Sequence, residues 1–276
     1  MIQHWETPVH PPLKLTGVTF GFGRKETAVQ SPVLKNVSLM IGSGEVLGIL
    51  GPNGSGKSTL LKILMRILVP QQGTIEWFGQ PPDAFSQADI ARHVAFVPQE
   101  TQQAFPFTIN EMVLMGRYPH HGRTWGLGWE GSHDRAVAMQ AMRDLDVAHL
   151  GTRLITNVSG GERQRAVIAR ALAQEPEVLL LDEPTAFLDL HHQLDIARII
   201  RRLNRECGLT VVLVSHDLNL ASQYCDRVLL LREGEIVTVG SPEEVIAAAS
   251  LEPVYGCSVL VDQHPQSGRP RVTLPV

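Results

Sequence analysis

The stretch that decides the fold is Val46-Leu47-Gly48-Ile49-Leu50-Gly51-Pro52-Asn53-Gly54-Ser55-Gly56-Lys57-Ser58-Thr59. Its first five residues are continuously apolar, as in a strand that is buried on both faces of a sheet. A glycine-rich turn follows, and after it apolar residues recur at helical spacing. The pattern predicts a strand, a loop and a helix that Pro70 and Gly73 close. The apolar residues of that helix are Leu60, Leu61, Ile63, Leu64, Ile67 and Leu68.

The turn fits the pattern GxxxxGK[ST] of a phosphate-binding loop. Its glycines allow successive backbone N–H groups to curl around phosphates, and the positive end of the following helix dipole adds to the attraction. Lys57 is expected to reach the β- and γ-phosphates, and the Ser58 hydroxyl is a hard oxygen ligand of the kind that Mg²⁺ prefers. We therefore expect nucleotide contacts from Gly51, Pro52, Asn53, Gly54, Ser55, Gly56, Lys57, Ser58 and Thr59.

A second buried strand, Val178 to Leu181, ends in the two adjacent acids Asp182 and Glu183. Buried acids are costly without a partner, and a metal ion is a suitable one. Asp182 is predicted to hold Mg²⁺ through water, whereas Glu183 is predicted to orient and polarise the water that attacks the phosphate.

A third motif begins a helix with Val158-Ser159-Gly160-Gly161-Glu162-Arg163. Ser159 and Glu162 read as a capping box, which is a purely structural explanation for these two residues. The two glycines between them weaken a helix unless something must approach the backbone closely. Because the chain already has one phosphate-binding loop, we expect Ser159, Gly160, Gly161 and Glu162 to contact the nucleotide of a neighbouring molecule.

Taken together and in this order, the motifs resemble those of ATP-binding-cassette nucleotide-binding domains over roughly residues 13 to 245. The resemblance implies a homodimer of ATPase subunits that hydrolyses Mg·ATP, with each nucleotide held between the phosphate loop of one subunit and the Ser159–Glu162 segment of the other. Val158 stands where the family usually has leucine, an apolar exchange that leaves the backbone donors in place.

The resemblance also assigns roles to three polar residues that stand outside these motifs. Gln99, after Phe96-Val97-Pro98, matches the glutamine that links Mg²⁺ and water to the membrane partner. Asp189 matches the loop aspartate that communicates across the dimer, and His216 matches the histidine that contacts the γ-phosphate. The expected catalytic set is therefore Glu183, His216, Gln99 and Lys57, and the expected metal set is Ser58, Gln99 and Asp182.

An aromatic residue of the family stacks on adenine, and Phe22 lies at its position. Stacking needs only a π-face, so phenylalanine can serve without a hydroxyl group. Phe20 is the alternative, and a core position for both residues stays open at this point.

The fold class that follows is α/β, a P-loop NTPase with a mostly parallel sheet core, an antiparallel β subdomain and an inserted helical subdomain. Residues 1–12 are a proline-spotted lead-in, 13–245 the nucleotide-binding domain and 246–276 a C-terminal extension with no assigned role. The helical subdomain covers about 100–158.

Composition excludes several classes of partner. The chain has 276 residues and a net charge of −4, so nothing favours nucleic acid, and the basic helix face of Arg198, Arg201, Arg202 and Arg205 is expected to be solvated. The apolar runs are strand-sized, far below the roughly 20 residues of a membrane helix. The family resemblance implies a peripheral protein at the cytoplasmic face of the cell membrane, attached through a permease.

Three further segments resemble importers of iron–siderophore complexes, haem or cobalamin: Gly116 to His120, Leu188 to Gln193, and His216 to Ala221. The resemblance implies an integral membrane permease, which Phe105, Pro106 and Phe107 could contact, and indirectly an extracytoplasmic substrate-binding protein. A soluble cassette ATPase without a transport role, or a transporter for another cargo, remains the alternative. Because adjacent histidines point in different directions, His191 and His192 are not expected to share a metal ion.

Overall fold

A computed structural model of the chain describes residues 10–23, 32–99, 105–121 and 131–275. Within these residues the largest sheet has six strands in the order β5-β6-β7-β3-β8-β9. The strands from β5 to β8 pair in parallel, and β9 runs antiparallel to β8 at the edge. Their bounds are β3 Val46–Leu50, β5 Val94–Val97, β6 Val178–Asp182, β7 Thr210–Val214, β8 Arg227–Arg232 and β9 Glu235–Gly240.

The central strands are apolar throughout because both faces of this sheet are covered. In β3, Val46 and Leu50 belong to a buried cluster on one face, and Leu47 and Ile49 belong to a second cluster on the other. Side chains alternate between the faces of a strand, so each cluster receives every second residue. The mostly parallel sheet predicted from the sequence is confirmed.

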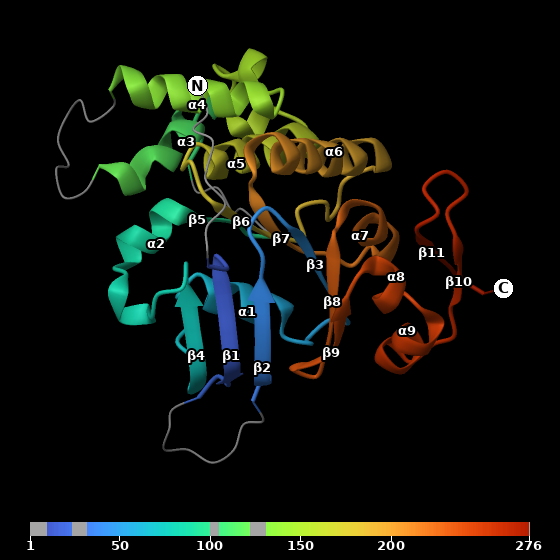
Figure 1. The fold of residues 1–276 in the computed structure, drawn as a ribbon. Helices are drawn as coiled ribbons and strands as arrows, with labels where there is room; N and C mark the ends of the chain where they lie inside the picture. Colours follow the sequence, from blue (N-terminus) through green and yellow to red (C-terminus); the bar gives the residue numbers. More distant parts are fainter. Residues whose placement is uncertain (1–9, 24–31, 100–104, 122–130, 276) are drawn as a thin grey trace.

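A second, antiparallel sheet has the strand order β2-β1-β4. Its buried side chains form one cluster with α1 and with one face of the central sheet. This packing places the helix that follows the glycine-rich loop between two sheets (Figure 1). The elements are β1 Leu13–Phe20, β2 Leu34–Ile41, α1 Lys57–Leu64 and β4 Gln72–Trp77.

The helix α1 is shorter than the sequence predicts. It ends at Leu64, so the expectation that Ile67 and Leu68 are helical is wrong. Arg66 adopts a φ of +56°, and the N–H groups of Ile67 and Leu68 both donate to the carbonyl of Lys62, at 2.9 and 3.2 Å. The left-handed residue turns the chain back and satisfies a terminal helix carbonyl before Pro70 is reached.

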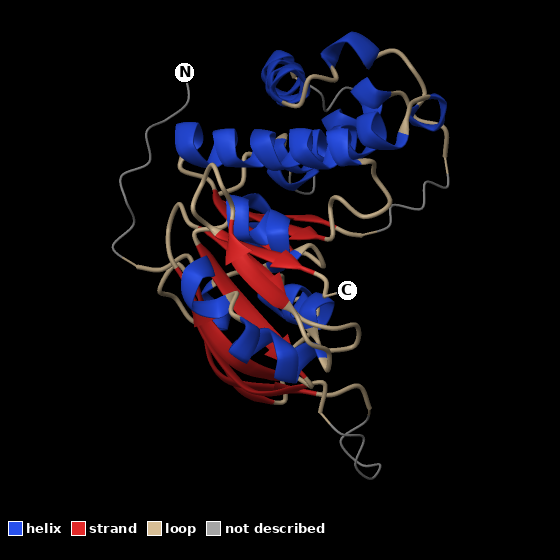
Figure 2. Ribbon diagram, turned by 90° about the vertical axis from the view of Figure 1, so that its right-hand side faces the viewer, coloured by secondary structure: helices blue, strands red, loops and turns tan. Residues whose placement is uncertain are grey.

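Helices cover the other face of the central sheet. Among them α3, α4 and α5 pack against one another, and Figure 2 shows a layer of helices on one side of the strands. The bounds of these helices are α3 Ile109–Leu114, α4 Ser132–Asp144, α5 Gly160–Leu172, α6 Leu190–Cys207 and α7 Leu218–Tyr224. The helix α2, Gln87–His93, instead buries Ile90 in the cluster shared with the antiparallel sheet. In the part of the chain that is described, no helix is both long and apolar enough to cross a membrane.

A buried arginine joins these helices. Arg117, only 3% exposed, lies 3.1 Å from the Asp134 carboxylate and 2.7 Å from that of Glu175, and it donates to the carbonyl of Ala173 at 2.8 Å. Gly116 is required beside it, because a Cβ there would stand 2.1 Å from the carbonyl oxygen of Arg170. These contacts give the Gly116–His120 segment a structural role in the chain.

The C-terminal extension is folded. The helix α8, Pro242–Val245, ends just before it, and the extension itself consists of α9 Ala248–Tyr255 and a hairpin of β10 Leu260–Gln263 and β11 Pro270–Thr273. The hairpin packs on α7 (Figure 1), where Asn219 exchanges two hydrogen bonds with the backbone of Val272 and the Ser222 hydroxyl donates to Pro270 at 2.6 Å. The segment that the sequence leaves unassigned is thus built onto the central sheet domain.

Candidate nucleotide-binding and hydrolysis site

The glycine-rich loop leads from the end of β3 into α1, as predicted. Gly51 has a φ of +149°, and a Cβ there would lie 2.1 Å from the carbonyl oxygen of Leu231. At Gly56, with a φ of +106°, a Cβ would lie 2.7 Å from Leu34. A Cβ at Gly54 would have no atom of the described residues within 4 Å. Two glycines therefore let the loop pass close to its own chain, and the third leaves its outer side open to a ligand.

Lys57 is the first residue of α1 and is 6% exposed. Its ammonium donates to the carbonyl oxygens of Gly51, at 2.9 Å, and Pro52, at 3.0 Å. Burial lowers the pKa of Lys57, and the nearby carboxylates of Glu183 and Asp182 oppose that effect. A cation is thereby placed under the loop in which phosphates are expected.

Asp182 ends β6 and is 5% exposed. Burial raises the pKa of its carboxyl group, while a hydrogen bond with Ser58 acts in the opposite direction. The Oδ1 atom is buried and has no hydrogen-bond partner in the described chain. A buried carboxylate oxygen without a partner, next to a hydroxyl oxygen, is a donor set that fits Mg²⁺.

Glu183 follows directly and adopts a φ of +50°, which is unfavourable for a residue with a side chain. The strained backbone turns its carboxylate toward Gln99, whose amide donates to Glu183 Oε2 at 2.6 Å. His216, which follows β7, contacts Oε1 through its Nε2 atom. Three residues expected to be catalytic thus meet at the carboxyl ends of three parallel strands, β5, β6 and β7.

One cavity of about 560 Å³ collects these groups. Nine of the predicted residues line it: Asn53, Gly54, Gly56, Lys57, Ser58, Thr59, Gln99, Glu183 and His216. Val33, Ala186 and Phe187 line it too, and the sequence analysis did not identify them. The sequence signal for Phe187 is an aromatic residue two positions before Asp189. In the structure this residue is 90% exposed and has a φ of +62°.

The Ser159–Glu162 segment does not line this cavity. Ser159 caps α5, and the capping box with Glu162 is complete, as predicted. A Cβ on Gly161 would lie 2.4 Å from the ring of His192, so this glycine already has a packing reason within the chain. At Gly160, which is exposed, the nearest atom would be 3.5 Å away. Only Gly160 therefore leaves free space above the helix end.

The structure also places the two remaining predicted contact residues. Asp189 is the N-cap of α6 and accepts from the N–H of His192 at 3.0 Å. Phe22 is 52% exposed and meets Phe20 edge to face at 5.1 Å, whereas Phe20 is 7% exposed and belongs to the core. Of the two aromatics, Phe22 is therefore the one that solvent or a ligand can reach. Neither Asp189 nor Phe22 lines the cavity.

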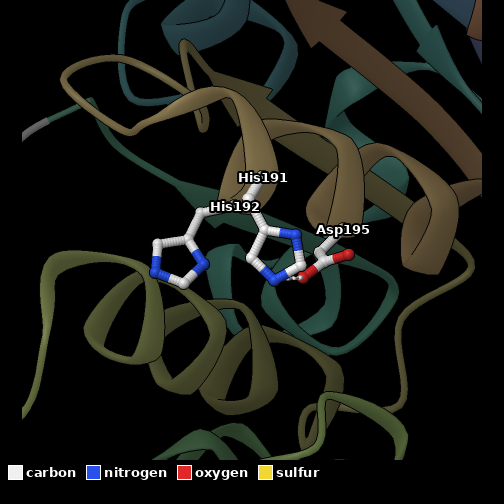
Figure 3. Close-up of side chains that lie close together, drawn as sticks. All are labelled: His191, His192 and Asp195. Atoms are coloured by element: carbon white, nitrogen blue, oxygen red, sulfur yellow. Dashed lines mark ion pairs between the residues drawn. The ribbon is translucent and has the colours of Figure 1, made fainter.

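His191 and His192 lie closer together than expected. With Asp195 they place three potential ligand atoms within 4.8 Å of one another on the first turns of α6 (Figure 3). The two rings are 5.5 Å apart, and His191 Nε2 is 3.3 Å from the Asp195 carboxylate. The rings of His191 and His192 therefore do not diverge, and the expectation from their adjacent positions is wrong. An ion pair with Asp195 and packing on Gly161 account for the positions of these rings.

The extension contributes one residue that sequence reasoning missed. Tyr255, at the end of α9, lines a hollow of about 340 Å³ together with the loop residues Pro52 to Ser55. Burial raises the pKa of its hydroxyl group to about 12, and the backbone of Gly51 opposes that effect. No motif signals this contact, because it depends on the fold of the extension.

A parallel sheet, a phosphate-binding loop and a strand-end acid pair define a P-loop nucleotide hydrolase. Residues 34–186 match the family described as ABC transporter, and the chain belongs to that family. It is an ATP-binding subunit of the kind whose ATPase activity is coupled to transport.

Three relatives illustrate the match. The ferric enterobactin transport ATP-binding protein FepC of Escherichia coli strain K12 is 37% identical over 92% of this chain and 91% of its own length. The hemin import ATP-binding protein HmuV of Pseudomonas putida KT2440 is 41% identical, over 87% of this chain and 93% of that protein. The ATP-binding protein YvrA of Bacillus subtilis strain 168 is 39% identical over 95% of this chain, which spans 58% of its length.

Solved structures agree. A metal-chelate type ABC transporter in an inward-facing conformation matches with a TM-score of 0.80 and 30% identity, over 96% of this chain and 97% of that one. The dimeric cassette MJ0796 bound to ADP and phosphate matches with a TM-score of 0.70 and 30% identity, over 83% of this chain and 98% of that one.

Proposed function

We propose that the chain hydrolyses Mg·ATP as one half of a homodimer and thereby drives the import of a metal chelate through a separate membrane permease. ATP hydrolysis is supported by one observation: four predicted catalytic residues line a single cavity beside the open face of the phosphate-binding loop. They are Lys57, Gln99, Glu183 and His216. The cargo class rests on the relatives named above.

Phosphate binding falls to the loop and to Lys57. The N–H groups of the loop and the Lys57 ammonium bind the β- and γ-phosphates, and the carbonyl oxygens of Gly51 and Pro52 hold that ammonium in place before a nucleotide arrives. When bound, Mg²⁺ neutralises part of the phosphate charge. Ser58 and Asp182 would hold the ion, and Gln99 lines the same cavity as Ser58.

The chemical step uses Glu183. The oxygen of a water molecule attacks the γ-phosphorus, the bond to the leaving oxygen of ADP breaks, and the water proton passes to the Glu183 carboxylate. Gln99 and His216 fix the position of this carboxylate through their contacts with its two oxygens. Preorganised groups of this kind need no rearrangement as the reaction proceeds.

A dimer completes the site in this proposal. Its support is that Ser159 to Glu162 lie outside the cavity of their own chain and that Gly160 is exposed with free space above it. The matching MJ0796 cassette is dimeric. In the proposed assembly the second subunit applies its Ser159–Glu162 segment to the nucleotide held by the first.

The permease is the second proposed partner and would hold the chain at the cytoplasmic face of the membrane. Phe105 is 64% exposed and packs with Phe107 at a ring distance of 6.0 Å. Phe107 is half-buried against the core, so Phe105 is the exposed aromatic residue before α3 that is suited to receive a short helix of another protein. An extracytoplasmic binding protein would deliver the chelate to the permease without touching this chain.

Uptake measurements test the proposed cargo. Cells that carry the wild-type chain, Glu183→Gln or Glu243→Gln receive labelled ferric siderophore, haem or cobalamin. Glu243 is an exposed acid in the first turn of α8 and serves as the matched control. We expect Glu183→Gln to abolish the uptake of one of the three compounds and Glu243→Gln to leave it unchanged. Normal uptake of all three in Glu183→Gln cells would overturn the importer proposal and favour another cargo or a soluble role.

A further inference from the structure

Four arginines of α6 do not form a simple solvated face. Arg198, Arg201, Arg202 and Arg205 line a hollow of about 520 Å³ together with Arg269. Arg269 comes from the turn that leads into β11 and Tyr224 from α7, so the hollow lies between α6, α7 and the C-terminal hairpin. The sequence shows that the four arginines of α6 recur at helical spacing. It does not show that Arg269 lies beside them.

Two of these arginines are fixed by the protein. Arg201 forms a two-point pair with Asp226, at 2.7 and 2.6 Å. Arg269 donates to the carbonyl oxygens of Ser222, at 2.6 Å, and Cys225, at 2.8 Å. A guanidinium group has five N–H donors, so each of them keeps donors that these contacts do not use. Together they make a rigid, half-buried floor.

The other three arginines are exposed at the rim. Arg202 donates to the carbonyl of Asp144, and Arg198 lies 4.0 Å from Asp195. Arg205 makes no ion pair or hydrogen bond with any residue that the structure describes. Its charge is therefore available to a ligand.

Charge is not balanced around the hollow. Among the described residues, the acids nearby are Glu206 in the lining, Asp226 on Arg201, Asp195 near Arg198 and Asp144 beside Arg202. The five arginines therefore keep one positive charge in excess. The whole chain carries a net charge of −4, so this excess is local. Like charges three or four residues apart destabilise a helix by about 0.2–0.5 kcal/mol per pair. A helix dipole favours cations only in the last turn, which accounts for Arg205 but not for Arg198.

We infer that this hollow is a binding site for a polyanion that bears phosphate groups. Guanidinium groups bind phosphate through paired, charge-assisted hydrogen bonds, and here they converge from two separate segments of the chain. The hydroxyl group of Ser267 and the side chain of Tyr224 add polar groups to the wall. The phosphate could belong to a soluble compound or to a lipid headgroup.

Titration calorimetry with sodium tripolyphosphate tests the site. The measurements are made in a Lys57→Ala background, so that the phosphate-binding loop contributes little. Arg205→Glu is compared with Arg92→Glu, a reversal of an exposed arginine in α2. We expect Arg205→Glu to weaken binding roughly tenfold or more, because a charged hydrogen bond is lost and repulsion replaces it. Arg92→Glu should not change the affinity.

A second arm separates the two sources of phosphate. The same proteins are sedimented with phosphatidylcholine vesicles that contain or lack phosphatidylglycerol. Tripolyphosphate binding that depends on Arg205 assigns the site to a soluble compound, and Arg205-dependent binding to phosphatidylglycerol alone assigns it to a lipid headgroup. Binding of neither probe, or equal losses in both variants, would overturn the inference. If Arg205→Glu does not fold, Arg205→Gln takes its place.

Discussion

The Gln99 side-chain amide donates a hydrogen bond of 2.6 Å to the Glu183 carboxylate. The two residues are 84 positions apart in the chain and follow neighbouring parallel strands, β5 and β6. Gln99 precedes in sequence the segment that we propose to contact the permease, so this bond would link the proposed water-activating group to that contact. The orientation of the Glu183 carboxylate thus depends on the position of Gln99.

Replacing Glu183 with glutamine should separate binding from turnover. The shape of the side chain is kept, but the group that accepts the water proton is lost, so phosphate release should fall roughly 10²–10⁴-fold. ATP binding should remain, and the ATP-bound dimer should accumulate in light-scattering measurements. Glu243→Gln, on the exposed face of α8, is expected to behave as wild type. Undiminished hydrolysis in Glu183→Gln would contradict the assigned role.

Lys57→Ala should weaken nucleotide binding. The ammonium that the carbonyl groups of Gly51 and Pro52 hold under the loop is removed, and with it a charge-assisted contact to the phosphates. The dissociation constant of a fluorescent ATP analogue should rise roughly tenfold or more. Lys62→Ala, an exposed lysine in the same helix, is the matched control. A normal dissociation constant for Lys57→Ala would argue against the phosphate-binding assignment.

Asp182→Asn should stabilise the protein in the absence of nucleotide and metal. Burial raises the pKa of Asp182, so the ionised carboxylate opposes folding at neutral pH. Its effect on stability is absent below the unfolded-state pKa of about 3.9 and grows as the pH rises through the folded-state value. Urea unfolding at pH 7 should therefore show a gain on the order of 1 kcal/mol for the variant. That gain should vanish near pH 4, and a gain independent of pH would contradict the explanation.

The motifs predicted much of the site because short loops carry most of it. Motifs alone point to the loop from Gly51 to Thr59 and to the acid pair Asp182 and Glu183. They also point to the strand-end residues Gln99 and His216. The sequence could not show that Gln99 and His216 both contact the Glu183 carboxylate, because that depends on the order of the strands in the sheet. Nor could it foresee Tyr255 against the loop or Arg269 beside α6, because both follow from how the extension packs.

Arg117 illustrates another limit of prediction. Its segment resembles a feature of one transporter branch, yet in this chain the side chain is 3% exposed and paired with Asp134 and Glu175. Arg117→Ala should cost about 3–5 kcal/mol in urea unfolding, because Asp134 would be left buried without its cation. Arg92→Ala, which removes an exposed pair with Asp89, should cost less than about 1 kcal/mol. Equal losses in the two variants would show that the buried pair adds no stability of its own.

The two glycines at the start of α5 allow a test of the proposed dimer. At Gly161 an added Cβ would lie 2.4 Å from the His192 ring, so Gly161→Ala should destabilise the chain by about 1–3 kcal/mol. His192→Ala removes the clash, and the double variant should recover that loss. This pair of variants measures packing within one subunit.

Gly160→Ala isolates the contact between subunits. Among the residues that the structure describes, Leu188 alone comes within 4 Å of the new methyl group, at 3.5 Å, and alanine is the better helix former by about 1 kcal/mol. Its stability should therefore stay equal or rise. Steady-state ATP hydrolysis should nevertheless fall, because the methyl group would stand between the helix end and the phosphate held by the other subunit. A stable Gly160→Ala protein with full ATPase activity would mean that no phosphate approaches this backbone, and the two-subunit site would lose its main structural support.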